Sequence, residues 1–436
     1  MIKSYWNGIN VVTDIGWGDA GKGKLVDLGA QYADMVIRYS GGGNAGHTIR
    51  NAFGEFKNHL IPSGIFNPKT VCIITGGVVI DGSILVKEIQ ELSKRGIPIT
   101  PHNLRISDTA HLVMPWHKVR DGLREKSRGG RKIGTTGQGI GPTYSDRTAR
   151  EGIRVCDLFS REFMKILNET MAHQERLTKA LDSGEKSSRA IYNHDEILKD
   201  VERVKKIIKP FVTNILPIIH EYHRKKKNIL GEGAQGALLD IDLGGYPFVT
   251  SSNPGVVGFM KTTGISAKEI GRVIGTTRAY TARVGAGPMP TELFDATGVH
   301  IQEKGREFGT TTGRRRRCGW LDVPAMRYGT MIAGADVIAV TKLDVLDELT
   351  RIKVCVAYKV GGKEYRDLPT ASPQFMEKAR PVFVTLPGWK ENITLAKSFS
   401  AFPKNAQKYI KTIERLLGKP IDIISVGPER EATIFQ

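Results

Sequence analysis

A glycine loop between an apolar strand and a helix constrains the fold of this chain more than any other stretch. A β-branched run over residues 9–15 breaks into a loop over residues 16–24, and apolar residues at 25, 26 and 28 then resume helical spacing. Glycines at 16, 18, 21 and 23 let backbone N–H groups turn inward at a helix N-terminus, where the dipole favours an anion, and Lys22 adds a positive charge. The stretch predicts a phosphate-binding loop.

The loop also matches the pattern G-x-x-x-x-G-K from Gly16 to Lys22, with one exception. Gly23 stands where a Ser or Thr should hold Mg²⁺, so another group must bind the metal. Asp19 is the nearest candidate, because a carboxylate inside an anion site repels phosphate unless it binds metal or moves a proton. A glycine-rich turn capped by an Asp is the alternative, and the loop alone does not decide between them.

A second glycine loop favours the functional interpretation. It covers residues 41–48, follows the apolar run at 35–39 and contains His47. Two glycine loops at successive strand ends then offer Asp19 and His47 as an acid/base pair facing a phosphate site.

Six motifs together resemble the signature of the adenylosuccinate synthetase family, the GTP-dependent ligases that join aspartate to IMP. Residues 17–24 and 44–48 carry the first two, and residues 133–137, 232–236, 312–317 and 341–344 resemble the others in the same order. The resemblance covers nearly the whole chain. It implies one α/β domain over residues 1–436. Apolar residues at helical spacing indicate a helix-rich subregion at about 156–228.

The residues alone predict the same fold class. Strand-like runs alternate with helical stretches, which indicates a large, mostly parallel sheet flanked by helices. In such a sheet, ligands bind at the carboxyl ends of the strands, where these glycine loops fall.

The resemblance also implies a role for individual residues. Asp19, His47 and Lys22 would be catalytic, and Mg²⁺ would be held by Asp19 and the Gly46 carbonyl. GTP would contact Gly18, Gly21, Gly23, Lys24, Lys342, Asp344, Ser425 and Gly427. IMP would contact Asn44, Thr136, Arg150, Gln235, Thr250, Val284 and Gly285, with Arg150 reaching across a homodimer interface. Aspartate would contact Thr312, Arg314 and Arg316.

Three of these motifs also have chemical interpretations of their own. The Asp344 carboxylate suits the N1–H and 2-amino protons of guanine, although a surface Lys/Asp pair is the alternative. Gln235 offers a donor and an acceptor to a purine edge, or ties its own loop together. The arginine run at 314–317 suits bidentate capture of a dicarboxylate, whereas four arginines elsewhere would suggest nucleic-acid binding.

Charge and cysteine usage limit the partners. The chain has 64 basic and 45 acidic residues, a net charge of +19, which favours anionic ligands. The four cysteines are far apart without metal-ligand spacing, and no apolar run reaches the length of a membrane span. We therefore expect a cytoplasmic enzyme of small-molecule substrates, with neither nucleic acid nor membrane as a partner. A GTPase switch and a basic nucleic-acid binder are the alternatives.

The chain departs from the family pattern at four positions, Gly16, Ala20, Ser40 and Gln138. The first three shorten side chains expected beside the purine. A variant synthetase that uses dGMP to make a 2-aminoadenine precursor is therefore the alternative substrate assignment, with IMP preferred.

Overall fold

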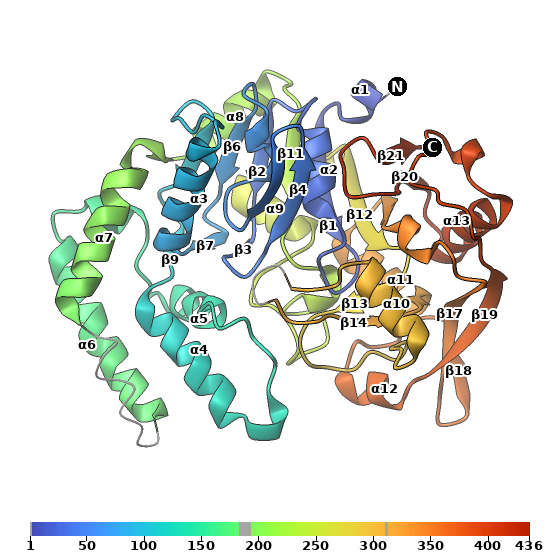
Figure 1. Cartoon of the computed structure of the whole chain (residues 1–436). Coiled ribbons are helices and arrows are strands. Elements are labelled where there is room, and N and C mark those ends of the chain that lie inside the picture. The colour runs from blue at the N-terminus through green and yellow to red at the C-terminus, as the bar shows by residue number, and fades with distance from the viewer. Residues whose placement is uncertain (1, 183–192, 310–312) are drawn as a thin grey trace.

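A mostly parallel sheet organises the computed structural model, which describes residues 2–182, 193–309 and 313–436 (Figure 1). Every neighbouring pair in this sheet is parallel except β20 and β21. Within the described residues the sheet has ten strands, in the order β10 (Val212–Thr213), β8 (Leu104–Ser107), β6 (Val71–Ile74), β2 (Met35–Arg38), β11 (Ile229–Glu232), β1 (Ile9–Asp14), β12 (Arg272–Arg278), β16 (Val337–Thr341), β20 (Ile421–Ser425) and β21 (Thr433–Phe435). The predicted fold class is confirmed.

The central strands are apolar because both faces of the sheet are covered. All residues of β1 and β16 are buried. Side chains alternate between the faces, so Val11 packs into one apolar core and the next residue, Val12, into the other. The strands thus separate two cores.

Helices cover both faces and extend to one side. Leu25 of α2 packs into the same core as Val12, whereas Phe259 of α9 and Met326 of α11 pack into the core of Val11. In Figure 1, α6 and α7 lie far from β17 and β19. The helices are α1 (Ile2–Tyr5), α2 (Lys22–Gly29), α3 (Gly82–Lys94), α4 (Pro115–Ser127), α5 (Ile140–Ala149), α6 (Phe163–Leu181), α7 (His194–Ile208), α8 (Leu216–Arg224), α9 (Val256–Thr263), α10 (Ala296–Lys304), α11 (Val323–Ala333), α12 (Pro373–Lys378) and α13 (Lys404–Leu417).

Short strands outside the main sheet form smaller sheets within the described residues. They pair β3 (Gly41–Gly42) with β7 (Val78–Ile80) and β9 (His111–Leu112), β4 (His47–Asn51) with β5 (Gly54–Asn58), β13 (Thr281–Arg283) with β14 (Arg317–Gly319), and β17 (Arg351–Val360) with β15 (Leu321–Asp322), β18 (Lys363–Tyr365) and β19 (Arg380–Pro387).

The register of the main sheet brings the predicted motifs to one edge. Val12 and Arg38, each near the end of its strand, both pair with Glu232 of the intervening β11. On the other side, Arg278 at the end of β12 pairs with Thr341 at the end of β16. The loops that follow these strands therefore meet at the carboxyl edge.

No helix in the described ranges is long and apolar enough to span a membrane.

Candidate active site

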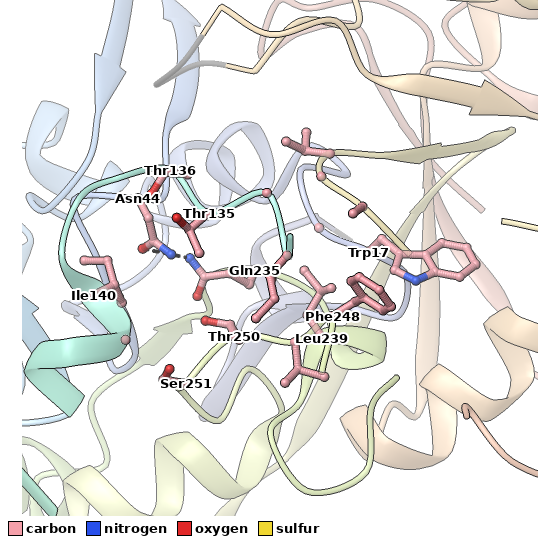
Figure 2. A pocket seen from close by; sticks show the side chains of 18 of the residues that line it. Trp17, Asn44, Thr135, Thr136, Ile140, Gln235, Leu239, Phe248, Thr250 and Ser251 are labelled. Atoms are coloured by element: carbon pink, nitrogen blue, oxygen red, sulfur yellow. Dashed lines mark hydrogen bonds between the residues drawn. The ribbon is translucent and has the colours of Figure 1, made fainter. Parts of the chain in front are cut away.

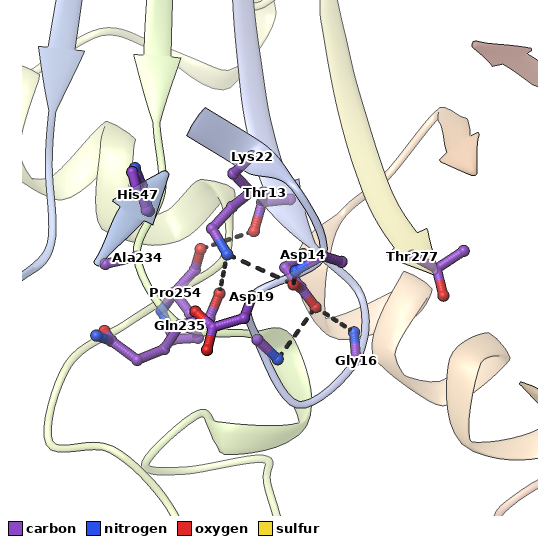
Figure 3. A network of polar contacts seen from close by, with 12 residues as sticks. Thr13, Asp14, Gly16, Asp19, Lys22, His47, Ala234, Gln235, Pro254 and Thr277 are labelled. Atoms are coloured by element: carbon purple, nitrogen blue, oxygen red, sulfur yellow. Dashed lines mark hydrogen bonds and ion pairs between the residues drawn. The ribbon is translucent and has the colours of Figure 1, made fainter. Parts of the chain in front are cut away.

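Lys22, the first residue of α2, points its ammonium group back over the glycine loop (Figure 3). The chain turns into the helix at Gly21, which has a φ of 79°. The Lys22 Nζ donates to the backbone carbonyl of Gln235 at 2.7 Å and lies 3.4 Å from Asp14 Oδ2. This buried cation at a helix N-terminus is suited to a phosphate.

Gly23 has a packing role that explains the missing Ser or Thr. A Cβ atom at this position would lie 2.8 Å from the Cβ of His47, which real Cβ contacts essentially never reach. The close approach of α2 to β4 therefore places His47 beside the start of the helix. The same contact excludes the hydroxyl side chain of the usual phosphate loop.

Asp19 lies in the middle of the glycine loop, and its carboxylate is about one-third exposed. Its Oδ2 accepts from Arg316 Nη2 at 2.8 Å. Burial alone would raise the pKa of Asp19, but the positive charges of Arg316, Arg278 and Lys22 outweigh it and lower that pKa. The carboxylate is therefore deprotonated at neutral pH and can accept a proton.

His47 is buried between a carboxylate and a guanidinium. Its Nδ1 contacts Glu232 Oε1 and lies 3.0 Å from Arg38 Nη1. Burial and the charge of Arg38 lower the pKa of His47, so the imidazole is neutral at neutral pH. Ser63 fixes the same carboxylate, with its N–H and Oγ donating to Glu232 at 2.8 and 2.7 Å.

One cavity of about 420 Å³ gathers residues predicted to bind IMP (Figure 2). The Gln235 amide Nε2 donates to Asn44 Oδ1 at 3.2 Å, and its Oε1 accepts from Ser252 at 3.2 Å. The lining includes Asn44, Thr136, Gln235, Thr250, Val284 and Gly285, together with Trp17 and Phe248. The cavity thus combines aromatic surface with amide and hydroxyl groups.

The small residues at the departures from the family pattern do not open this cavity. None of Gly16, Ala20 and Ser40 belongs to its described lining. Ala20 and Ser40 are 2% and 3% exposed, and a Cβ at Gly16 would contact Met326 at 3.3 Å. These positions are packed against protein, so their short side chains do not enlarge this cavity.

A second cavity, of about 690 Å³, gathers most of the residues predicted to bind GTP. Gly21, Gly23, Lys24, Lys342, Asp344, Ser425 and Gly427 line it, whereas Gly18 lines the first cavity. Asp19, Gly46, His47 and Gly309 line both. The two cavities therefore meet at the predicted catalytic pair.

The part of the second cavity lined by Asp344 suits a nucleobase. Asp344 Oδ1 is buried and has no hydrogen-bond partner among the described residues, and burial raises the pKa of this carboxyl group. Lys24 does not reach into the cavity as a free cation. Its Nζ donates to Ser425 Oγ, Gly427 O and Ala432 O at 2.7–2.8 Å, and burial lowers its pKa to about 7. Lys24 therefore ties α2 to the end of β20.

The predicted aspartate and dimer residues are only partly brought together. Arg316 lines the second cavity, and Arg314 donates to the Gly134 carbonyl at 3.3 Å. Thr312 lies outside the described residues. Arg150, the exposed C-cap of α5, is not part of the described lining of either cavity.

Glu307, which no motif in the sequence indicated, links several site residues. This buried carboxylate bonds Lys342 Nζ and Arg316 Nη1, both at 2.7 Å, and lies 2.9 Å from Arg278 Nε. Burial would raise the pKa of Glu307, but the three cations lower it instead. Arg38 and Glu232 were also unassigned. Only the GEGAQG glycine loop around Glu232 signalled a site in the sequence.

Comparisons with known proteins point to one family. The sequence model described as adenylosuccinate synthetase matches residues 11–434. The adenylosuccinate synthetase of Caldanaerobacter subterraneus subsp. tengcongensis is 44% identical, with 98% of both chains covered. That of Acaryochloris marina is 47% identical over 98% of this chain and 94% of the relative.

Solved structures agree with the sequence comparison. The fully ligated adenylosuccinate synthetase from Plasmodium falciparum superposes with a TM-score of 0.92 at 35% identity, covering 99% of this chain and 100% of the other. A succinoaminodeoxyadenylate synthetase from cyanophage S-2L, bound to dGMP and dATP, gives a TM-score of 0.60 at 17% identity, covering 98% and 95%. The second similarity is one of fold alone.

Proposed function

The chain belongs to the adenylosuccinate synthetase family, and we propose that the residues around its two adjoining cavities carry the reaction of that family. The reaction joins L-aspartate to IMP with GTP and yields adenylosuccinate, GDP and phosphate. IMP would occupy the cavity lined by Gln235, and GTP would occupy the cavity lined by Asp344. The shared lining at Asp19, Gly46 and His47 is the observation that carries this assignment, because phosphoryl transfer needs the γ-phosphoryl group next to the purine.

In the first step, Asp19 would take the proton from N1 of IMP, so that O6 becomes a nucleophile towards the γ-phosphorus of GTP. Lys22 and the N–H groups at the start of α2 would bind the phosphates. His47 would donate to the developing charge at O6 and the phosphoryl group. Although burial and Arg38 favour a neutral His47, an incoming anion favours a second ring proton, and Glu232 at Nδ1 stabilises it.

In the second step, the amine of L-aspartate would displace phosphate at C6 of 6-phosphoryl-IMP. Arg316, Arg314 and Thr312 would bind the carboxylates of the substrate. Arg316 pairs with Asp19 before substrate binds, so capture of a substrate carboxylate neutralises part of the charge that lowers the pKa of Asp19. Aspartate binding would thereby make Asp19 a stronger base.

The donor set suits Mg²⁺, which usually takes one or two protein ligands and completes its shell with phosphates and water. The Asp19 carboxylate and the Gly46 carbonyl would hold it, because both residues line both cavities. The described residues contain no group of three or more His, Cys, Asp or Glu placed to bind a metal alone. Bound Mg²⁺ supplies charge neutralisation at the phosphates.

We propose a cytoplasmic, single-domain enzyme that works as a homodimer, with Arg150 completing the IMP site of the neighbouring subunit. Arg150 is exposed and does not line the cavities of its own chain as described. Arg150→Leu and Asp19→Asn should each be inactive alone, and mixing them should restore partial activity, since one hybrid site keeps both groups. No recovery, with subunit exchange shown independently, would contradict the shared site.

Substrate dependence of GDP formation tests the assignment. Complete mixtures should form GDP and adenylosuccinate in equal amounts, and omission of IMP should abolish both products. GDP formation at an unchanged rate without IMP or aspartate would identify a GTPase switch instead. Absence of any turnover, combined with steeply salt-dependent nucleic-acid binding, would favour a nucleic-acid binder.

A further inference from the structure

Asp19 has an unusual backbone conformation for a residue with a side chain. Its φ is 60°, in the left-handed region that favours glycine and that Asp visits only as a single residue. The residues on either side cannot hold this conformation through their side chains, because they are Gly18 and Ala20. Contacts from outside the loop must therefore select it.

The buried carboxylate of Asp14 supplies the first of these contacts (Figure 3). Its Oδ1 accepts from the N–H groups of Gly16 and Gly18 at 2.8 and 3.3 Å, and its Oδ2 accepts from the N–H of Ala20 at 2.9 Å. The loop thus closes around an anion that belongs to the chain itself, through hydrogen bonds that the charge strengthens. These three N–H groups serve Asp14 in this structure rather than a bound phosphate.

The buried guanidinium of Arg278 supplies the second contact, from the side of the carbonyls. Its Nη1 donates to the Gly18 carbonyl at 3.0 Å and its Nη2 to the Asp19 carbonyl at 2.7 Å. The peptide unit after Asp19 is therefore held at both ends, by Asp14 at its N–H and by Arg278 at its carbonyl. The peptide unit before Asp19 is held at its carbonyl.

Arg278 is itself held by Glu307, the carboxylate that also orients Arg316. Glu307 lies 2.9 Å from Arg278 Nε and accepts from Arg316 Nη1 at 2.7 Å. The other guanidinium nitrogen of Arg316 reaches the Asp19 carboxylate. Through Glu307, one network thus holds both the backbone and the side chain of Asp19.

We propose that Asp14 and Arg278 are positioning residues, which hold Asp19 in its left-handed conformation and so aim its carboxylate at the reacting purine. The inference rests on the proposed role of Asp19 as the base. Neither residue touches substrate in this assignment. Arg278 acts on the rate through the loop, and Asp14 acts through the loop and through Lys22, whose Nζ lies 3.4 Å from its Oδ2.

The first test is Asp14→Asn, with Asp81→Asn as a matched control. The Asn amide replaces Oδ2 by a donor that faces the N–H of Ala20, so it breaks the contact next to Asp19. Asp81 is likewise buried and accepts from two backbone N–H groups, at the start of α3, away from both cavities. We expect kcat to fall at least about tenfold in Asp14→Asn, with KM for IMP and aspartate within about threefold of the parent, and Asp81→Asn to keep the parental kcat.

Hydrogen exchange and a second variant separate positioning from general destabilisation. The amide of Ala20 should exchange at least about tenfold faster in Asp14→Asn and at the parental rate in Asp81→Asn. Arg278→Lys keeps the charge beside Glu307 but loses the fork that spans two carbonyls, so it should give the same fall in kcat at constant KM.

The outcomes also distinguish this inference from the proposed function. An inactive Asp19→Asn combined with fully active Asp14→Asn and Arg278→Lys would overturn only the positioning roles. An active Asp19→Asn would overturn the role of Asp19 and the inference with it. An equal loss of kcat in Asp81→Asn would show that the effect is one of stability, and would also overturn the proposal.

Discussion

At the base end of the GTP cavity, Asp344 Oδ1 is a buried acceptor without a described partner. A buried polar group left in this state is costly unless a ligand satisfies it. The N1–H and 2-amino protons of guanine suit a carboxylate, whereas adenine presents an acceptor at N1 and no 2-amino group. We therefore propose that Asp344 selects GTP over ATP at this site.

Asp344→Asn should raise the KM for GTP because the amide presents a donor to one of the guanine protons. The mismatch is worth about 1–3 kcal/mol, roughly a fivefold to 150-fold loss. KM values for IMP and aspartate should hold, and XTP, whose C2 oxygen accepts from the amide, should become a better substrate. An unchanged KM for GTP would show that Asp344 does not read the base.

In the proposed assignment the other cavity binds the purine monophosphate, and the packing of Gly16, Ala20 and Ser40 near it bears on substrate choice. These residues contact protein and do not belong to the described lining of the cavity. We therefore expect IMP to remain preferred over dGMP. The preference in kcat/KM should exceed about tenfold, or about 1.4 kcal/mol. Parity or a preference for dGMP, at equal GTP and aspartate, would contradict this reading of the three positions.

At the scale of elements, the start of α2 and the start of β4 form one unit through Gly23 and His47. Gly23→Ser would restore the hydroxyl of the usual phosphate loop, yet its Cβ would lie 2.8 Å from the Cβ of His47. We therefore expect the variant to displace His47, with kcat lowered at least about tenfold and a lower melting temperature.

Gly122→Ser is the matched control for this prediction. Gly122 lies within α4, and a Cβ there would meet no heavy atom within 4 Å. The control should keep activity, and serine is a better helix former than glycine. Higher activity in Gly23→Ser would indicate that the loop tolerates the hydroxyl and uses it on the metal.

The elements around the site were predictable where the signal is local. The strand, glycine loop and helix of residues 9–29 follow from apolar spacing and glycine positions, and α3 begins at Gly82 because Asp81 caps it. Glu307 and Arg278 were not predictable, because their partners meet only in the folded chain. Gly18, for example, lies 260 residues from Arg278. A single charged residue in the sequence does not indicate which distant residue it will contact.

At the scale of the whole molecule, histidines with lowered pKa values link stability to pH. Burial and the charges of Arg147 and Arg154 lower the pKa of His111 to about 4, and burial also lowers the pKa of His47. In the unfolded chain these histidines gain a proton near pH 6.5, whereas His111 in the folded chain gains one only near pH 4. At these two histidines, acidification through this window favours the unfolded state, and the stability that they contribute should fall as the pH falls.

His111→Gln should weaken this dependence, because glutamine has no proton to gain. The loss in melting temperature between pH 7 and pH 5 should be smaller in His111→Gln than in the parent, measured without substrates. His102→Gln, at an exposed histidine, is the control and should follow the parent. The carboxylates of Glu232 and Glu307 have lowered pKa values, so their stabilising contribution is lost only below about pH 4.5 and does not confuse the comparison. Equal losses in melting temperature in all three proteins would show that protonation of His111 does not contribute to the pH dependence of stability.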